Sequence, residues 1–342
     1  KKSKCCYRGQ PKQLGDFNDS GIIITVYRSK WMEWTVIARR QGTNFVLFLC
    51  VFLLVGCWPA PNYPWVDLDE PPLPATLTFE IQPPLRIAIS AILSPSSTAQ
   101  NYERFLTYLA EHLGRPVELV QRSTYAEVNN LLCDGGVDLA LVCTGAYVRG
   151  HQDFGMQLLV IPQVKGETVY YSYIIVPADS PAHTLLDLRD KVFAFTDPMS
   201  NSGHLMPVYM LRQAGEAAES FFSRTTYTYS HDNSIRAVAE GLVDGAAVDS
   251  LVYQFATSRD PSLAERVRVI AKSQACGMPP VVVHPNLDKD LKASLRELLL
   301  TMHQNPPGRA ALADLMIDRF VLTDDSAYDS IHAAMQQLGE LP

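Results

Sequence analysis

From residue 85 onward, short apolar runs alternate with amphipathic stretches, and this alternation constrains the fold more than any other feature of the chain. The first series predicts strands over 85–89, 117–120 and 137–142 and helices over 101–113 and 125–133. Strands that are joined through helices pair in parallel, so the pattern predicts an α/β fold in which a mostly parallel sheet is flanked by helices.

The alternation pauses after residue 142 and resumes near Lys191. The second series predicts strands over 192–195, 226–229 and 246–248 and helices over 205–214 and 233–241. Extended crossings at 170–176 and 274–283 would join two α/β lobes into a hinged protein with a cleft. We expect lobe 1 to hold residues 85–177 plus 274–342, and lobe 2 to hold residues 178–273.

Residues 1–57 have the pattern of an N-terminal extension followed by a lipoprotein signal. A basic flank precedes an apolar run of 11 residues over 45–55, which is shorter than a typical membrane-spanning helix. The run ends in Leu-Val-Gly-Cys, which resembles a bacterial lipobox whose cysteine, Cys57, would carry lipid. The alternative is an uncleaved anchor with an incidental cysteine. Met32 is the first methionine, so we expect translation to start there.

Residues 58–84 are rich in proline and acidic residues, and they predict a tether between the lipid and the fold. The formal net charge is −7, with 20 basic and 33 acidic residues after residue 56, which argues against a nucleic-acid partner. Cys133, Cys143 and Cys276 form neither a CxxC pair nor a Cys/His cluster, so no metal or other cofactor is expected. Whether two of these cysteines pair stays open.

The segment Asp197-Pro198-Met199-Ser200-Asn201-Ser202-Gly203-His204 lies between a predicted strand and a predicted helix. A helix start presents unpaired N–H groups and a positive dipole end, which suit a phosphate-like anion. Ser200, Asn201 and Ser202 provide more donors than one helix cap uses. The alternative is an unusually polar N-cap.

Other polar residues would face the same cleft, because ligands of open α/β sheets bind beyond the carboxyl ends of the strands. Tyr125 begins a predicted helix, Tyr170 lies at the first crossing, and His231 and Asp249 each follow a predicted strand. His204 is as consistent with a solvent-facing position as with a functional one.

These segments resemble the PhnD-like family, the phosphate, phosphite and phosphonate receptors of ABC importers. The resemblance covers about residues 84–340 and rests on Tyr125-Ala126, Tyr170-Tyr171-Ser172, Phe195 to Gly203, Ser230-His231-Asp232-Asn233-Ser234 and Ala247-Val248-Asp249-Ser250. It implies a two-lobed type II periplasmic-binding fold. It also implies that Ser200, Asn201 and Ser202 bind the phosphonyl oxygens, that His231 donates to another oxygen, and that Tyr125 and Tyr170 close from lobe 1.

The chain departs from the family pattern at informative positions. The central Ser-Thr-Ser of the family is Ser200-Asn201-Ser202 here. The acids that hold the amine of aminoalkyl phosphonates are matched by Leu251 and Pro279, which favours phosphite, phosphate or methylphosphonate. Asp249 would repel a dianion, so we hypothesise that it selects an oxyanion that carries a P–OH proton. The alternative role for Asp249 is a turn or a helix cap.

Three functions are compatible with this pattern. The first is a lipid-anchored receptor that delivers a phosphorus oxyanion to an ABC permease with a separate ATPase subunit. The second is a ligand-sensing domain that partners a membrane kinase or a chemoreceptor. The third is a hydrolase using Ser200 or Ser202 with His231 and Asp232, which the absence of a G-x-S-x-G motif disfavours, so we expect no enzyme.

Overall fold

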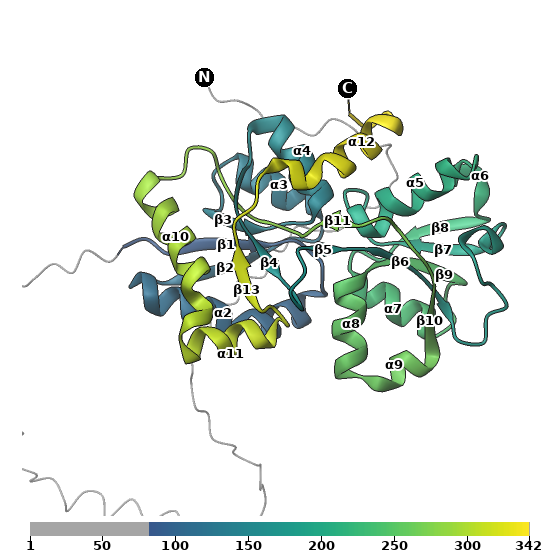
Figure 1. The fold of residues 1–342 in the computed structure, drawn as a ribbon, viewed down its shortest axis with the longest axis horizontal. Helices are drawn as coiled ribbons and strands as arrows, with labels where there is room; N and C mark the ends of the chain where they lie inside the picture. Colours follow the sequence, from purple (N-terminus) through teal and green to yellow (C-terminus); the bar gives the residue numbers. More distant parts are fainter. Residues whose placement is uncertain (1–81, 342) are drawn as a thin grey trace, which may run out of the picture. The chain divides into compact units, whose positions relative to one another are not determined.

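The structure is a computed structural model that describes residues 82–341, in which two main sheets carry helices on their faces (Figure 1). The predicted lipid site at Cys57, the start at Met32 and the tether up to residue 81 lie outside the described residues. The strands are β1 Leu85–Ile89, β2 Val117–Gln121, β3 Leu139–Leu141, β4 Gln157–Gln163, β5 Val169–Tyr170, β6 Ser172–Pro177, β7 Val192–Phe195, β8 Arg224–Tyr227, β9 Gly245–Asp249, β10 Val267–Lys272, β11 Cys276–Gly277, β12 Val281–Val283 and β13 Arg319–Val321.

Helices connect most of these strands, and several short helical turns (η) join them. The helices are α2 Pro95–Leu113, α3 Tyr125–Cys133, α4 Thr144–Phe154, α5 Met206–Gln213, α6 Ala218–Phe221, α7 His231–Ala239, α8 Ser250–Arg259, α9 Pro261–Arg266, α10 Lys289–Thr301, α11 Pro306–Asp314 and α12 Asp329–Gln337. The short turns are η1 Leu185–Leu188, η2 Asn201–Leu205, η3 Met302–Gln304 and η4 Asp325–Tyr328. None of the helices within residues 82–341 has the length and apolar character needed to cross a bilayer.

The first sheet has the order β13-β4-β12-β3-β1-β2, and the second has the order β10-β6-β9-β7-β8. Within residues 82–341, parallel pairing is confined to β2-β1-β3 and β9-β7-β8. The expectation of mostly parallel sheets is therefore wrong in this detail, and both sheets are mixed. In the first sheet, β12 follows a crossing from the second sheet and is antiparallel to both of its neighbours. In the second sheet, β6 follows a crossing from the first and is also antiparallel to both of its neighbours.

The two sheets are connected through a pair of crossing strands. β5 and β11 hydrogen-bond to each other in antiparallel register, with Tyr170 opposite Cys276, and Figure 1 shows them between the two sheets. β6 follows β5 directly and hydrogen-bonds within the second sheet. The exact lobe boundaries stay a prediction.

Each sheet buries apolar side chains on both faces, as its alternating strands require. In the first sheet, Ile87 contributes to the cluster under α2, α10 and α11, whereas Ala88 contributes to the cluster under α3, α4 and α12. In the second sheet, Phe193 packs with α5 and α6, and Ala194 packs with α7, α8 and α9. These layers hold the carboxyl ends of the parallel strands and the helix starts that follow them in fixed positions.

Candidate ligand-binding site

The first turns of several helices are hydrogen-bonded to one another across the two sheets. The N–H of Tyr125, at the start of α3, donates to Asp197 Oδ2 at 3.1 Å, although Asp197 follows β7 of the second sheet. The N–H of Asn201, at the start of η2, donates to the Sγ atom of Cys143 before α4 at 3.3 Å. The N–H of Asp249, before α8, donates to Nδ1 of His231 at the start of α7 at 3.1 Å. The positive ends of these helices therefore meet around one place.

Two glycines allow this close approach. A Cβ atom on Gly145 would lie 2.6 Å from the carbonyl oxygen of Met199, because the start of α4 presses against the loop before η2. A Cβ atom on Gly203 would lie 2.5 Å from Thr196, because η2 packs directly onto the end of β7. A larger residue at either position would displace backbone or a buried side chain at the centre of the site.

The Ser200-Asn201-Ser202 segment is fully buried at the start of η2. Ser200 caps the turn, since its Oγ atom accepts from the N–H of Gly203 at 3.0 Å. The alternative reading of this segment as a helix cap is thus confirmed for Ser200. Its hydroxyl hydrogen can still donate, because a hydroxyl donates and accepts at once. The Ser202 hydroxyl has no hydrogen-bond partner among the described residues.

Asn201 and Tyr170 lie together in one buried network. Nδ2 of Asn201 donates to the Tyr170 hydroxyl at 3.0 Å, and the Tyr170 hydroxyl also bonds Thr144 Oγ1 at 2.7 Å. Burial raises the pKa of Tyr170 well above its ordinary value, so the phenol is neutral. One amide hydrogen of Asn201 is thus committed to a wall residue, while Oδ1 has no partner within residues 82–341.

Five buried polar atoms around the helix starts lack a hydrogen-bond partner among the described residues. They are Ser90 Oγ, Tyr125 OH, Asn201 Oδ1, Ser202 Oγ and Ser230 Oγ. A buried polar group without a partner costs about 1–3 kcal/mol, and most native proteins leave few of them. Their gathering at the carboxyl ends of strands indicates a place for a polar ligand.

Ser90 and Ser230 were not predicted as site residues. Ser90 directly follows β1, and Ser230 is the residue before α7. The signal that could have found them is the one that found His231 and Asp249, namely a polar residue at a strand end or helix start.

His231 is a neutral donor in this arrangement. Its Nδ1 atom accepts the N–H of Asp249, so the ring hydrogen of the neutral form is on Nε2. Burial lowers the pKa of His231 to about 3, which keeps the ring uncharged at neutral pH. None of the lysines and arginines that the structure describes is buried. An anion here would be bound by hydroxyls, an imidazole N–H and helix dipoles.

Two buried aspartates flank the hydroxyl groups and differ in their partners. Asp197 accepts from backbone on both oxygens, with the N–H of Met199 at 2.8 Å from Oδ1. Asp249 accepts the N–H groups of Leu251 and Val252 on Oδ1, at 2.7 and 3.4 Å, and so caps α8. Burial raises the pKa of Asp249 to about 7. Asp249 thus combines the predicted alternative role of a cap with a carboxyl that can hold a proton at neutral pH.

His204 lies apart from these groups, against an aromatic wall. Its ring contacts Phe195 edge-on, with centroids 4.9 Å apart, and also lies near Tyr227. Burial lowers the pKa of His204 to about 4. Between residues 82 and 341, no group of three His, Cys, Asp or Glu side chains could hold a metal ion.

Residues 87–328 match the sequence model of the family described as "ABC transporter, phosphonate, periplasmic substrate-binding protein". The "Phosphonates-binding periplasmic protein" of Escherichia coli K12 is 26% identical over 239 residues, which are 68% of this chain and 70% of that protein. The "Phosphate-import protein PhnD" of Mycolicibacterium smegmatis is 34% identical over 182 residues, which are 49% of this chain and 57% of that protein. The chain thus spans just over half the length of the second relative.

Solved structures agree with this assignment. The binding protein component of an ABC phosphonate transporter from Pseudomonas aeruginosa superposes with a TM-score of 0.71 at 25% identity, over 76% of this chain and 87% of that one. The expected α/β fold of type II periplasmic-binding proteins is confirmed. The chain belongs to the family of periplasmic substrate-binding proteins of phosphonate ABC transporters.

Proposed function

We propose that the ligand of this substrate-binding protein is a small phosphorus oxyanion without an amino group, such as phosphite, phosphate or methylphosphonate. The observation that carries the proposal is the pair of fully buried hydroxyls of Tyr125 and Ser202, which have no hydrogen-bond partner among the described residues, together with the neutral His231. Tetrahedral oxyanions accept several hydrogen bonds at once, and neutral donors at helix starts bind them without a lysine or an arginine. The names of the two relatives, which refer to phosphonates and phosphate, support the same ligand class.

The roles of the residues follow from their free donors. Ser200, Ser202 and Tyr125 would donate hydroxyl hydrogens to the oxyanion, and His231 would donate from Nε2. Asn201 and Tyr170 would shape the wall, since the Asn201 amide already donates to the Tyr170 hydroxyl. Asp249 would accept a P–OH hydrogen from the ligand or donate its own proton to an ionised oxygen.

The residues around the candidate site support a ligand without an amino group, because few carboxylates among the described residues are available to pair with an ammonium group. Leu251 and Pro279 stand where the resemblance puts the acids of aminoalkyl phosphonate binders. Of the two buried aspartates in the described part of the chain, Asp197 has backbone donors on both oxygens. Asp249 alone would then face the ligand, and its burial favours the protonated form.

Isothermal titration with phosphate, phosphite, methylphosphonate and 2-aminoethylphosphonate tests the proposal. We expect at least one of the first three to bind and 2-aminoethylphosphonate to bind most weakly. Ser202→Ala should weaken binding, while Ser234→Ala, which alters a buried serine already bonded to Thr228 at 2.6 Å, should not. Tightest binding of the amino compound would contradict the ligand class. Binding of none of the four would contradict the function.

We also propose that Cys57 carries the lipid that holds the protein at the extracytoplasmic face of a membrane, next to its permease and separate ATPase subunits. The Leu-Val-Gly-Cys sequence after an apolar run supports this. Metabolic labelling with a palmitate analogue should mark the wild-type protein and leave Cys57→Ala unlabelled. Equal labelling of both would exclude this anchor.

A further inference from the structure

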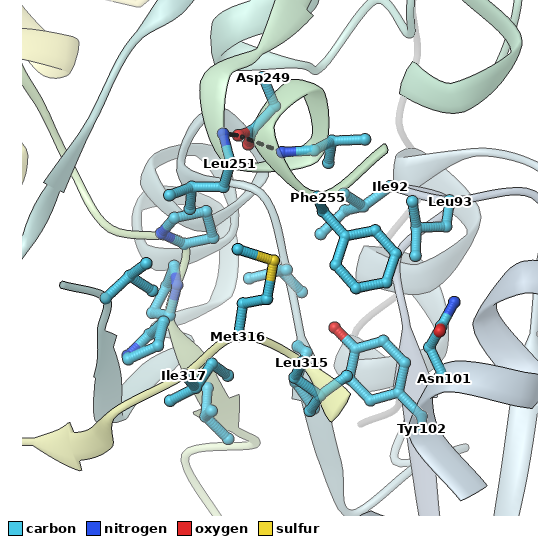
Figure 2. Close-up of a pocket in the computed structure, with 18 of the residues that line it drawn as sticks. Ile92, Leu93, Asn101, Tyr102, Asp249, Leu251, Phe255, Leu315, Met316 and Ile317 are labelled. Carbon is cyan, nitrogen blue, oxygen red and sulfur yellow. Dashed lines mark hydrogen bonds between the residues drawn. The ribbon is translucent and has the colours of Figure 1, made fainter. Parts of the chain in front are cut away.

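A largely apolar pocket lies between α8, which packs on the second sheet, and a wall formed by α2, strands of the first sheet and the loops next to them. Its cavity volume is about 130 Å³, and among the described residues Asp249 is the only charged one that lines it. Figure 2 shows Asp249 at one end and Tyr102 at the other, with Phe255 and Met316 between them. Elements from both sheets therefore enclose one apolar space that a polar group closes at each end.

Three separate segments of the chain contribute residues both to this pocket and to the predicted oxyanion site. Ile92 of the pocket is two residues beyond Ser90, and Val142 of the pocket precedes Cys143 in the site wall. Leu251 of the pocket donates its N–H to Asp249, which belongs to both regions. The N–H of His231 also donates to the carbonyl oxygen of Ile92 at 3.0 Å. The polar site and the apolar pocket are thus adjacent along the chain and joined by hydrogen bonds.

The far end of the pocket, around Tyr102 and Asn101, carries no charge. The pKa of Tyr102 is raised to about 12 by burial and by the carboxyl of Asp249, so the phenol is neutral. Asn101, beside it, donates its Nδ2 hydrogen to the carbonyl oxygen of Ser97 at 2.7 Å. A charged substituent would lose its hydration here without gaining a partner, whereas an apolar one would gain buried contact.

We propose that this pocket receives the carbon substituent of a phosphonate whose oxyanion occupies the polar site. The inference rests on the proposed function and narrows it. Phosphate and phosphite leave the pocket unfilled, and methylphosphonate only reaches its mouth. The best ligands are then phosphonates that carry apolar substituents of several carbons. Leu251 and Pro279, which both line the pocket, are the residues that select against an amine.

Titration with methyl-, ethyl-, propyl- and butylphosphonate tests this inference directly. Each added methylene that enters the pocket should lower Kd about fourfold, from the transfer free energy of one CH₂ group. Equal or weaker binding from methyl to butyl would overturn the inference and leave the proposed function intact. If methylphosphonate, phosphite and phosphate all fail to bind as well, the proposed function fails and the inference fails with it.

A matched pair of variants locates the effect, and a third variant fills the pocket without adding charge. Leu251→Glu puts a carboxylate into the pocket, in the first turn of α8, where the helix dipole favours it. It should abolish the gain from methyl to butyl and improve binding of 2-aminoethylphosphonate relative to methylphosphonate. Leu242→Glu makes the same change at a side chain that is 65% exposed and should leave the fourfold steps unchanged.

Met316→Trp fills the pocket without adding charge, so it should weaken the binding of butylphosphonate more than the binding of methylphosphonate. An identical loss of affinity for both ligands would contradict the placement of the carbon substituent in this pocket.

Discussion

Single hydroxyl groups decide what the candidate site can bind. The Ser200 hydroxyl accepts a backbone N–H, whereas the Ser202 hydroxyl is buried without a partner in the described part of the chain. An unpaired buried hydroxyl lowers the stability of the free protein and is available to a ligand. Binding and stability are therefore expected to respond in opposite directions to its removal.

Ser202→Ala tests this separation. We expect the affinity for methylphosphonate to fall about 10-fold or more, since a hydrogen bond to a charged group contributes roughly 1.5–3 kcal/mol. The melting temperature of the ligand-free variant should stay equal or rise, because the change removes an unpaired polar atom. Calorimetry and thermal unfolding measure the two effects. A clear loss of melting temperature with unchanged affinity would show that the hydroxyl is only structural.

The carboxyl of Asp249 makes stability depend on pH. Its pKa is raised to about 7 in the folded protein, against about 3.9 for an unfolded aspartate. The folded state therefore binds the proton more tightly, and stability decreases as pH rises from about 4 to 7. Asp249→Asn keeps a capping oxygen for α8 and removes the titration. Urea unfolding from pH 4 to 8 should show a weaker decrease for the variant, and identical slopes would contradict this assignment.

The same carboxyl should make binding depend on pH. Above about pH 7, the proton that Asp249 and the ligand share dissociates. The carboxylate of Asp249 and the fully ionised ligand then repel each other. We expect the affinity of the wild-type protein for methylphosphonate to fall between pH 7 and 9, and the fall to be smaller in Asp249→Asn. Affinity that is undiminished at pH 9 in the wild-type protein would rule out proton sharing.

At the scale of elements, the sequence predicts those whose ends carry local signals. The predicted helix over 125–133 is confirmed as α3, because Thr124 and Glu127 form a capping box at its start. The helix α4 was not predicted, because Gly145 and Gly150 lower the intrinsic helix propensity of its sequence. Its N-cap, Cys143, also makes no side-chain cap bond.

The residues of the candidate site also differ in how far a local sequence signal predicts them. Ser200 and Ser202 could be predicted because their motif is local, whereas Ser90 offers only the weaker signal of a single polar residue at a strand end. Which polar atoms stay unpaired is decided by tertiary contacts between α3, α4 and η2, which come from three separate parts of the chain.

The close approach of α4 to η2 makes a prediction at this scale. Gly145→Ala would push α4 away from Met199 and should lower both affinity and stability, the latter by about 1–3 kcal/mol. Gly150→Ala is the matched change in the same helix, where the added Cβ meets the flexible end of Met156. Titration and denaturant unfolding should show ligand affinity kept in Gly150→Ala and lost in Gly145→Ala. Equal affinity in both would mean that the contact does not shape the site.

At the scale of the described chain, both sheets contribute residues to the candidate site, and the crossing strands β5 and β11 hydrogen-bond to each other. Asp197, which follows β7 of the second sheet, adds a direct link between the two sides. Its carboxylate accepts a hydrogen bond from the N–H of Tyr125 in α3, which packs on the first sheet. Asp197→Ala should increase hydrogen exchange at the start of α3 and weaken ligand binding. Asp187→Ala, which removes an exposed capping carboxylate at η1, should do neither. Unchanged exchange in Asp197→Ala would show that the link does not hold the two sides together.

The central claim is that a phosphorus oxyanion is bound by neutral donors at the start of η2. A crystal structure with methylphosphonate tests it most directly. The account predicts the oxyanion within hydrogen-bond reach of Ser202, Tyr125 and Nε2 of His231, with its methyl group toward Leu251. A metal ion between the protein and the oxyanion, or a ligand bound away from these residues, would contradict it.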